Sequence, residues 1–254
     1  LGSALTNPVI TTDYSEALLE LITPPQDKSL SALDYLLDLE TFVYQHLDNE
    51  LLWATSMPCV IRGEADVRIA EYGTSNAGKM KHVYRQGLAN RYGKIMQIIA
   101  GIHYNHSIDE AFWPVWYQNE PEGAESLRSF KDRGYIRMTR NIQRYGWLII
   151  YLFGSSPAIC KSFLNGRPAN TSFKTLNEYT LYEPFGTSLR MGSIGYTNTK
   201  KHDRGIQVCY NSLDSYIASL KHAINTPSKE YSKIGLKVDG IYQQLNANTL
   251  QIEN

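Results

Sequence analysis

The chain has 254 residues, which is enough for one large domain or two small ones, and its 43% hydrophobic content can form a sizeable core. Its 25 Lys and Arg residues balance 25 Asp and Glu residues, so the formal net charge is zero. This balance lacks the positive excess that favours nucleic acids or anionic membranes, and we expect neither partner. The longest apolar run, from Trp147 to Phe153, is far shorter than the roughly 20 residues that span a bilayer.

The three cysteines, Cys59, Cys160 and Cys209, lie far apart in the sequence and form no Cys-x-x-Cys pair. Such an odd and sparse set predicts free thiols in a reducing compartment. The N-terminus has neither the basic nor the apolar region of a signal peptide, so we expect a soluble, cytoplasmic protein. Because the chain begins with Leu1 and ends abruptly at Asn254, we expect a piece of a longer protein.

The first elements predicted along the chain are a strand and a helix. Residues 8–24 are rich in β-branched side chains and are followed by a proline pair, which predicts an extended segment and then a strand. Asp13 and Glu20 have opposite parity in this strand, so they can reach one site only if a bend or bulge near Ser15 resets the register. Apolar residues at helical spacing predict an amphipathic helix over 29–47, capped by a serine near its start.

A glycine-rich stretch at 73–79 matches part of a phosphate-binding P-loop. Met80 occupies the position where the Mg²⁺-binding Ser or Thr belongs, so we favour a turn in which Asn76 caps a helix over 79–92. Core packing is the commoner role for aromatic residues on such a helix. One helical face carries Tyr84, Leu88 and Arg91, with Arg85 alongside.

The segment 96–107 is predicted to be a central strand. Because side chains alternate along a strand, one face would carry Gln97, Ile99, Gly101, His103 and Asn105. Gly101 lets another group approach next to His103, and the polar face predicts the floor of a site. The commoner role for a single histidine in a strand is a hydrogen-bonded or surface residue.

The second half of the chain mixes helices and strands without a regular βαβ rhythm. We expect a loop-rich region at 109–133, a helix over 134–152, a short helix after Pro157 and another helix ending before Thr226. On the helix expected over 134–152, arginines 137, 140 and 144 favour a solvated or ion-paired face over phosphate contacts. Two strands near the C-terminus follow, with Asp239-Gly240 as a hairpin turn. These features predict an α+β fold with an antiparallel sheet.

Short sequence words in a fixed order make the chain similar to glutamate–cysteine ligases of the enteric-bacterial type. The words include Leu-Gly-Ser-Ala-Leu-Thr (1–6), Ser-Met-Pro-Cys (56–59), Tyr-Gly-Thr-Ser-Asn (72–76), His-Tyr-Asn (103–105), Thr-Ser-Leu-Arg (187–190) and Leu-Gln-Ile-Glu-Asn (250–254). They extend over essentially the whole chain and are weakest at 109–130. The resemblance implies a glutamine synthetase-like antiparallel sheet, curved into a half-funnel with helices around it.

The resemblance also implies a reaction in which ATP phosphorylates the γ-carboxylate of L-glutamate and the amine of L-cysteine attacks the acyl phosphate. This is the first step of glutathione biosynthesis. A carboxylate that faces a triphosphate is strongly repelled, so such a site needs Mg²⁺ (or Mn²⁺) held by acidic residues. By the resemblance, Asp13, Glu20 and His103 would ligate the metal, and Arg85 would be a cation near the transferred phosphoryl group.

The same resemblance implies a cysteine-binding pocket with an arginine at one end. Arg190 would form two parallel charge-assisted hydrogen bonds with the α-carboxylate of cysteine. Leu88 and Ile99 would give the thiol side chain an apolar slot, and Tyr196 begins a polar run that would close over the substrate. The full set of implied pocket residues is Tyr84, Leu88, Gln97, Ile99, Arg190 and Tyr196.

Some site residues of the family have no counterpart in this chain. An acidic pair of metal ligands would lie upstream of Leu1, and a Tyr, a Glu and an Arg would lie beyond Asn254. We therefore expect residues 1–254 to be a single catalytic domain, the central part of a ligase that is either separate or fused to glutathione synthetase, and inactive alone. Two alternatives stay open: a related carboxylate–amine ligase with a different amine acceptor, and a non-catalytic binding fragment.

Overall fold

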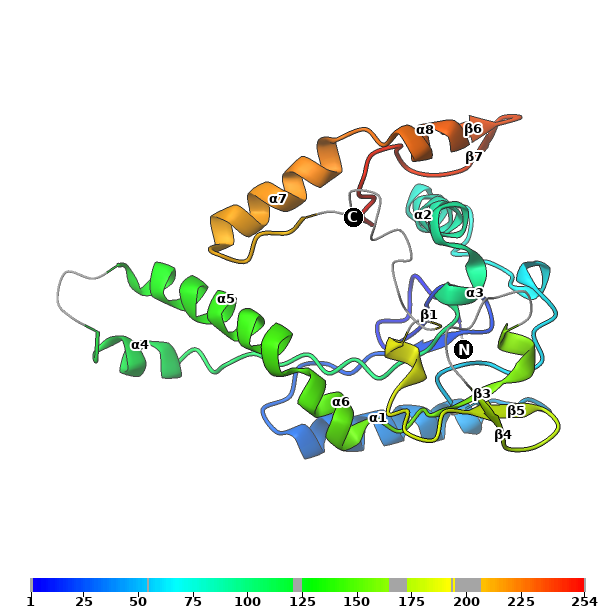
Figure 1. Ribbon diagram of the computed structural model, residues 1–254, viewed down its shortest axis with the longest axis horizontal. Coiled ribbons are helices and arrows are strands. Elements are labelled where there is room, and N and C mark those ends of the chain that lie inside the picture. The colour runs from blue at the N-terminus through cyan, green and yellow to red at the C-terminus, as the bar shows by residue number, and fades with distance from the viewer. Residues whose placement is uncertain are drawn as a thin grey trace.

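The computed structural model describes residues 2–53, 55–120, 125–164, 173–192, 194 and 207–253 of the chain (Figure 1). The α-helices are α1 (Ser29–Tyr44), α2 (Asn76–Tyr92), α3 (Lys94–Gln97), α4 (Phe112–Tyr117), α5 (Leu127–Tyr145), α6 (Trp147–Phe153), α7 (Leu213–Asn225) and α8 (Lys229–Ile234). Short 3-10 helices are η1 (Glu64–Asp66), η2 (Lys161–Leu164) and η3 (Leu189–Met191). The strands are β1 (Ile10–Thr12), β2 (Leu19–Leu21), β3 (Ala158–Cys160), β4 (Lys174–Thr175), β5 (Thr180–Tyr182), β6 (Lys237–Val238) and β7 (Ile241–Tyr242).

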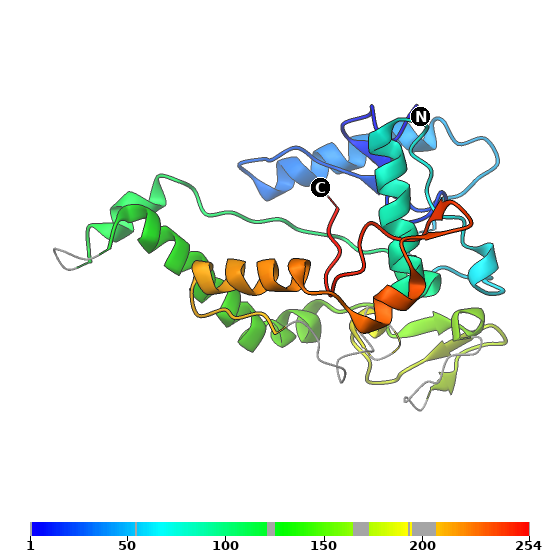
Figure 2. The same cartoon turned by 90° about the horizontal axis from the view of Figure 1, so that it is seen from above.

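Helices α4 and α5 form an arm that extends away from the part of the molecule that holds the strands, α2 and α3 (Figure 1). Helix α7 contacts α5, and the two helices cross at an angle when seen from above (Figure 2). From α7 the chain returns to α2, where Asn90 Nδ2 donates to the carbonyl of Gln243 at 2.9 Å. The guanidinium of Arg91 donates to Gln244 Oε1 at 3.1 Å, so the C-terminal end of α2 is tied to the C-terminal segment.

The strands pair in small antiparallel sheets with the orders β1-β2, β3-β5-β4 and β6-β7. The predicted Asp239-Gly240 turn joins β6 to β7, with φ values of 50° and 82°, as a two-residue hairpin turn requires. The predicted α+β class and the antiparallel pairing are therefore confirmed. In the described part of the chain, no helix is both long and apolar enough to cross a membrane.

The prediction of a central strand over 96–107 is wrong. The chain forms α3 up to Gln97 and then runs on without an adjacent strand; the amide of Ala100 donates instead to the carbonyl of Ser56 at 2.8 Å. Ile102 and Tyr104, which would lie on the opposite face of such a strand, are 94% and 68% exposed. Side-chain alternation alone does not make a strand, because a strand needs a partner that accepts its backbone hydrogen bonds.

Several predicted boundaries also differ. The helix expected over 134–152 begins earlier and is divided at Gly146 into α5 and α6, and α4 occupies part of the region expected to be loops. Strand β3 and η2 replace the helix expected after Pro157, because β3 finds a partner in β5. Ser75 rather than Asn76 caps α2, and its Oγ accepts from the amide of Gly78 at 3.1 Å. No side chain caps α1, whereas α7 begins with a capping box at Ser212.

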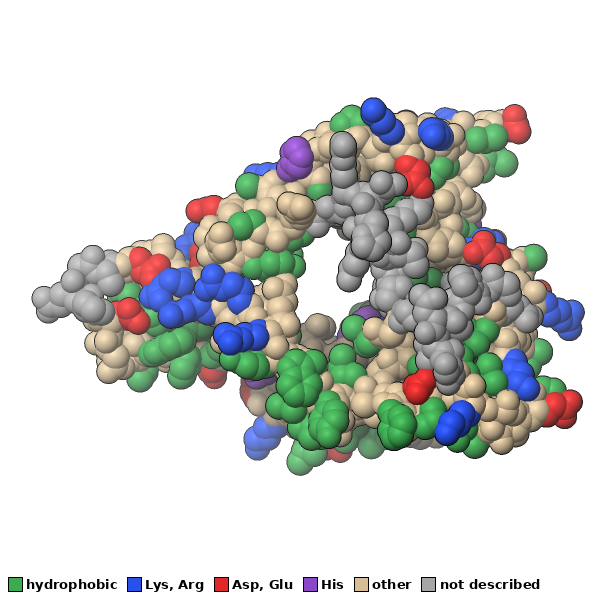
Figure 3. Space-filling view, viewed as in Figure 1, with side chains coloured by type: hydrophobic (Ala, Val, Ile, Leu, Met, Phe, Trp, Pro, Cys, Tyr) green, Lys and Arg blue, Asp and Glu red, His purple; other side chains and the backbone are tan. Residues whose placement is uncertain are grey.

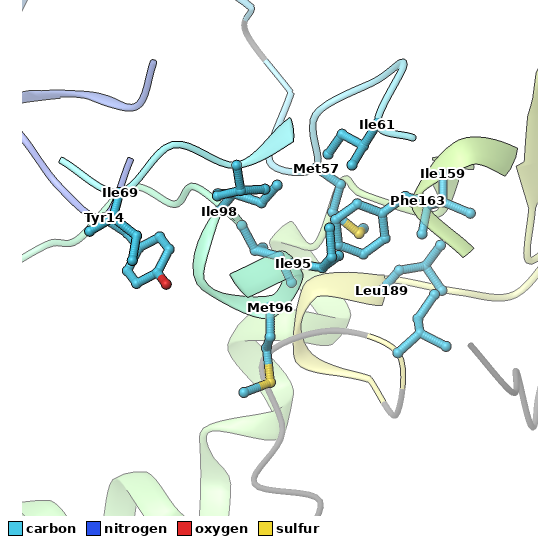
Figure 4. Close-up of a cluster of buried hydrophobic side chains, with 13 residues drawn as sticks. Tyr14, Met57, Ile61, Ile69, Ile95, Met96, Ile98, Ile159, Phe163 and Leu189 are labelled. Atoms are coloured by element: carbon cyan, nitrogen blue, oxygen red, sulfur yellow. The ribbon is translucent and has the colours of Figure 1, made fainter. Parts of the chain in front are cut away.

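The main hydrophobic core surrounds the segment that leads to His103 (Figure 4). Ile95, Met96, Ile98 and Ile99 come from α3 and the residues directly after it, and pack against side chains from the N-terminal hairpin, the 57–69 loops and β3 to η3. Burying each such side chain contributes about 1.5–3 kcal/mol. The chain is thus anchored firmly up to Ile99, and only then becomes exposed.

Helix α6 contributes nothing to this core, because none of its residues is buried. Trp147 and Phe153 are 62% and 76% exposed, and Figure 3 shows hydrophobic side chains gathered on the surface at this place. The arginines predicted to line a solvated face lie on α5, and residues 137, 140 and 144 are exposed there. No ion pair is formed by these three arginines within the described residues, so the solvated alternative holds.

Candidate functional site

A hairpin brings Asp13 and Glu20 into one site. Strands β1 and β2 pair so that Thr11 lies opposite Glu20, and the amide of Asp13 donates to the carbonyl of Leu18 at 3.0 Å. The chain therefore reverses direction around Ser15, where the sequence required a change of register. The change is a tight turn between two strands, rather than a bulge within a single strand.

The two carboxylates repel each other electrostatically. Desolvation is the main cause that raises the pKa of Glu20, and the charge of Asp13 adds to it. Desolvation also raises the pKa of Asp13, although the positive charge of Arg85 and the imidazole of His103 oppose the rise. Two nearby carboxylates with raised pKa values form a site where a cation would be favourable.

Arg85, on α2, interacts with both acids and is only 7% exposed. Its Nε donates to the backbone carbonyl of Asp13 at 2.5 Å, and its Nη1 donates to Glu253 Oε1 at 3.2 Å. The guanidinium also stacks 4.6 Å from the ring centroid of Tyr72. These contacts fix the position of Arg85, and its charge acts on both Asp13 and Glu20.

Tyr72 hydrogen-bonds to the backbone of the same hairpin. Its hydroxyl lies 2.6 Å from the carbonyl of Thr12 and 2.7 Å from that of Asp13, and donates its proton there. Burial raises the pKa of Tyr72 to about 12, so the phenol stays protonated at neutral pH. The backbone that carries Asp13 is therefore held by Tyr72 and Arg85 together.

Glu253 and Lys81 were missed by the sequence reasoning. Lys81 Nζ lies 2.6 Å from Glu253 Oε1, the same oxygen that Arg85 contacts. Burial raises the pKa of Glu253, but hydrogen bonds from Lys81 and Arg85 outweigh that effect, so the carboxyl group has a lowered pKa overall. An isolated acid near the C-terminus carries no pattern that would mark it, since its partners lie about 170 positions away in the chain.

Arg190 and His103 meet over Gly101. Arg190 Nε donates to the carbonyl of Ala100 at 2.8 Å, and its Nη2 lies 3.5 Å from His103 Nε2. Since arginine can only donate, His103 Nε2 accepts in this contact. A Cβ atom added at Gly101 would lie 2.5 Å from Arg190 Nη2. The expectation that this glycine lets another group approach beside His103 is confirmed, and that group is the guanidinium of Arg190.

The remaining residues of the predicted cysteine pocket are divided between α2 and the segment around α3. Gln97 and Ile99 are buried at 5% and 3% exposure. Leu88 packs against the core cluster that contains Ile99, so both apolar members of the predicted slot lie at the same core. Tyr84 is half-buried one turn before Leu88 on α2, and Tyr196 lies outside the described residues.

The metal-binding prediction rests on the chemistry of the donor set. Within the described residues, no group of three or more His, Cys, Asp or Glu side chains lies close enough together to hold an ion as the chain stands. Mg²⁺ usually takes only one or two protein carboxylates and completes its shell with water and substrate phosphates. The carboxylate pair, with its unfavourable mutual charge, fits such an ion.

The fold and this site define an α+β protein in which an acidic pair, Asp13 and Glu20, and the guanidinium of Arg190 both interact with His103. A model of the family described as glutamate-cysteine ligase matches residues 1–254, and the chain belongs to this family. It is 52% identical over 259 residues to the glutamate–cysteine ligase of Alcanivorax borkumensis, covering 100% of this chain and 48% of that protein. It is also 52% identical to the corresponding protein of Pseudomonas entomophila, of which it covers 47%.

Solved structures of related proteins also match the fold of this chain. The glutamate–cysteine ligase of Francisella tularensis in complex with AMP matches with a TM-score of 0.86 at 37% identity, over 99% of this chain and 48% of that one. A bifunctional glutathione synthetase from Pasteurella multocida matches with a TM-score of 0.71 at 29% identity, over 89% of this chain and 27% of that one. The chain thus spans about half the length of the curated relatives it matches.

Proposed function

We propose that the protein that carries this chain joins the γ-carboxylate of L-glutamate to the amine of L-cysteine, using ATP. The observation that carries the proposal is the junction at His103. His103 interacts electrostatically with the carboxyl groups of Asp13 and Glu20, on which the charge of Arg85 also acts. Arg190 Nη2 lies 3.5 Å from His103 Nε2. A single residue thus interacts both with an anionic pair and with a cationic group, as a two-substrate site requires.

At the acidic end, Asp13 and Glu20 would hold Mg²⁺ or Mn²⁺, with His103 as a further donor. Such an ion would supply the positive charge that offsets the repulsion between the γ-carboxylate and the triphosphate of ATP. Arg85 keeps the Asp13 backbone in place and adds a fixed positive charge near the transferred phosphoryl group. The AMP complex of the Francisella tularensis relative supports a nucleotide site in this family.

At the other end, Arg190 pairs with the α-carboxylate of cysteine while Leu88 and Ile99 face its thiol. Gln97 and Tyr84, with Tyr196, supply polar groups around the amine and carboxylate. Arg190 is already oriented by Ala100, so little conformational entropy is lost when the substrate binds. Holding the amine against the acyl phosphate is the main catalytic task of these residues.

The test is phosphate release by the protein that carries this chain, with ATP, L-glutamate and an amine acceptor. We expect turnover to require all three substrates, and to fall at least about tenfold when cysteamine, which lacks the α-carboxylate, replaces cysteine. Equal rates with both acceptors would favour a related ligase with a different acceptor. Binding of ATP and Mg²⁺ without turnover would favour a non-catalytic binding protein.

A substitution at Gly101 separates this proposal from a purely structural role of the same residues. We expect Gly101→Ala to raise the KM for cysteine by about tenfold, because the new Cβ would displace the Arg190 guanidinium and weaken about one charge-assisted hydrogen bond. The melting temperature should barely change, since Arg190 has a flexible side chain and Gly101 is exposed. Gly192→Ala, where the added Cβ makes only ordinary contacts from 3.4 Å, is the matched control. An unchanged KM for Gly101→Ala would argue against a role of Arg190 in binding.

A further inference from the structure

A pocket of about 300 Å³ is lined by two of the three cysteines and by none of the site residues described above. Cys59 comes from the loop that follows Met57, and Cys160 is the last residue of β3. Ser162 Oγ lies 3.1 Å from Cys160 Sγ and accepts from the amide of Ile61 at 3.1 Å, so it holds the two segments together. Both cysteines are half-buried free thiols, and each reaches the pocket.

The two thiols interact directly, and the interaction makes them unequal. Burial raises the pKa of Cys160, but hydrogen bonds from Cys59, Ser162 and the amide of Val60 outweigh it and lower the value to about 7. The hydrogen bond with Cys160 is the main cause that raises the pKa of Cys59, and burial adds to it. The interactions of the pair therefore favour ionisation of the Cys160 thiol over that of Cys59.

The backbone directly after Cys59 is strained at Val60. Val60 has a φ of 56°, in the left-handed region, which is rare for a β-branched residue. Its side chain is 74% exposed, so packing of the side chain does not account for this conformation. The Val60 backbone also acts on both thiols and lowers the pKa of each. Strain of this kind persists where the surroundings impose it, and it is concentrated at functional sites.

We propose that Cys59 and Cys160 form a site of thiol–disulfide exchange with small disulfides such as cystine or glutathione disulfide. The Cys160 thiolate attacks one sulfur of the small disulfide, forming a mixed disulfide and releasing one small thiolate. Cys59 then loses its proton and attacks Cys160 Sγ, forming the Cys59–Cys160 disulfide and releasing the second small thiolate. One small disulfide is reduced to two thiols, and two protein thiols are oxidised to one disulfide.

The pocket and the expected rate both fit this chemistry. A volume of about 300 Å³ lies at the lower end of small-molecule pockets, and Trp53 with Pro157 gives it apolar walls. At pH 7 a thiol with a pKa of about 7 is about half ionised, compared with about 1% for the ordinary value of about 9. Because nucleophilicity falls together with pKa, the net gain in rate for Cys160 is about fivefold.

Hydrogen bonds connect the proposed exchange site to the candidate ligase site. Ser56, in the wall of the pocket, accepts a hydrogen bond from Ala100, whose own carbonyl accepts from Arg190. Ser156, in the same wall, accepts from the amide of Leu189 at 2.9 Å. A disulfide between Cys59 and Cys160 would join the two segments that carry these serines.

The experiment exposes the purified protein to cystine or to glutathione disulfide, quenches free thiols and identifies the products by mass spectrometry. For the wild type we expect a Cys59–Cys160 disulfide and two released small thiols for each bond formed, with an apparent pKa near 7 for the reaction. Cys59→Ser should trap a stable mixed disulfide on Cys160. In Cys160→Ser, Cys59 should react at least about fivefold more slowly than Cys160 does in the wild type.

Cys209 is the internal control. Hydrogen bonds from Ser215 and from the backbone of Asn211 also lower its pKa, but no second thiol interacts with it. It should form only a mixed disulfide, equally in all variants. The faster of the two reagents identifies the small disulfide that the pocket accepts. The absence of a Cys59–Cys160 bond in the wild type, with Cys209 modified in the same sample, would overturn the proposal without bearing on the ligase function.

Discussion

Replacing Arg190 by alanine should raise the KM for cysteine by about 30-fold, with a smaller effect on kcat. Loss of one partner of a partly buried charged pair costs about 2 kcal/mol, and each 1.4 kcal/mol is a factor of about ten in affinity. Arg190→Lys should raise the KM by about tenfold, because lysine keeps the charge but loses the planar pair of donors. Steady-state kinetics at saturating ATP and glutamate measures both effects.

The substrate offers a way to isolate the carboxylate contact. Cysteamine lacks the α-carboxylate, so wild type and Arg190→Ala should use it with the same KM. Arg68→Ala is the matched control, because the Arg68–Glu71 ion pair joins side chains that are 71% and 60% exposed. Such a surface pair contributes little, and the KM should stay within about twofold of wild type. A normal KM for cysteine in Arg190→Ala would assign its carboxylate to another residue.

Local sequence signals predicted those parts of the fold that depend on neighbouring residues. The Asp239-Gly240 turn and the helix that ends before Thr226 form as expected, because a turn and an amphipathic helix are signalled by residues close together in the sequence. The segment around His103 differs, because its alternating pattern suits a strand while its backbone partners are single groups in distant loops. Strand formation depends on a partner that the local pattern does not reveal.

In the candidate site, too, local features could be predicted from the sequence, whereas contacts between distant parts of the chain could not. Asp13 and Glu20 are seven positions apart, so the need for a change of register near Ser15 could be stated from the sequence, and the hairpin meets it. The contacts of Arg85 with Glu253 and of Arg190 with Ala100 join parts of the chain that are 168 and 90 residues apart. Contacts at such separation depend on the packing of the core, which composition and periodicity do not specify.

Asp13→Asn and Glu20→Gln should each lower kcat at least about 100-fold and shift half-saturation to higher Mg²⁺. Loss of a negative oxygen ligand removes several kcal/mol of charge stabilisation when the γ-carboxylate meets the triphosphate. Rates measured over a range of Mg²⁺ concentrations separate weaker metal binding from slower chemistry. Glu71→Gln is the control, since Glu71 is exposed and pairs only with Arg68 among the ion pairs of the described residues. Full activity of Asp13→Asn would remove this residue from the metal site.

The same substitutions should stabilise the folded chain while they remove activity. Asp13 and Glu20 both have raised pKa values in the folded state because of desolvation, to which the charge of Glu253 adds at Asp13 and the charge of Asp13 adds at Glu20. The folded chain therefore binds more protons than the unfolded chain just above the ordinary values of 3.8 and 4.5, and stability falls as the pH rises through that range. Asp13→Asn removes one charge and should reduce this fall, as urea unfolding at pH 5 and pH 7.5 would show. Mg²⁺ should stabilise the wild type at pH 7.5 more than the variant, and an equal effect on both would place the ion elsewhere.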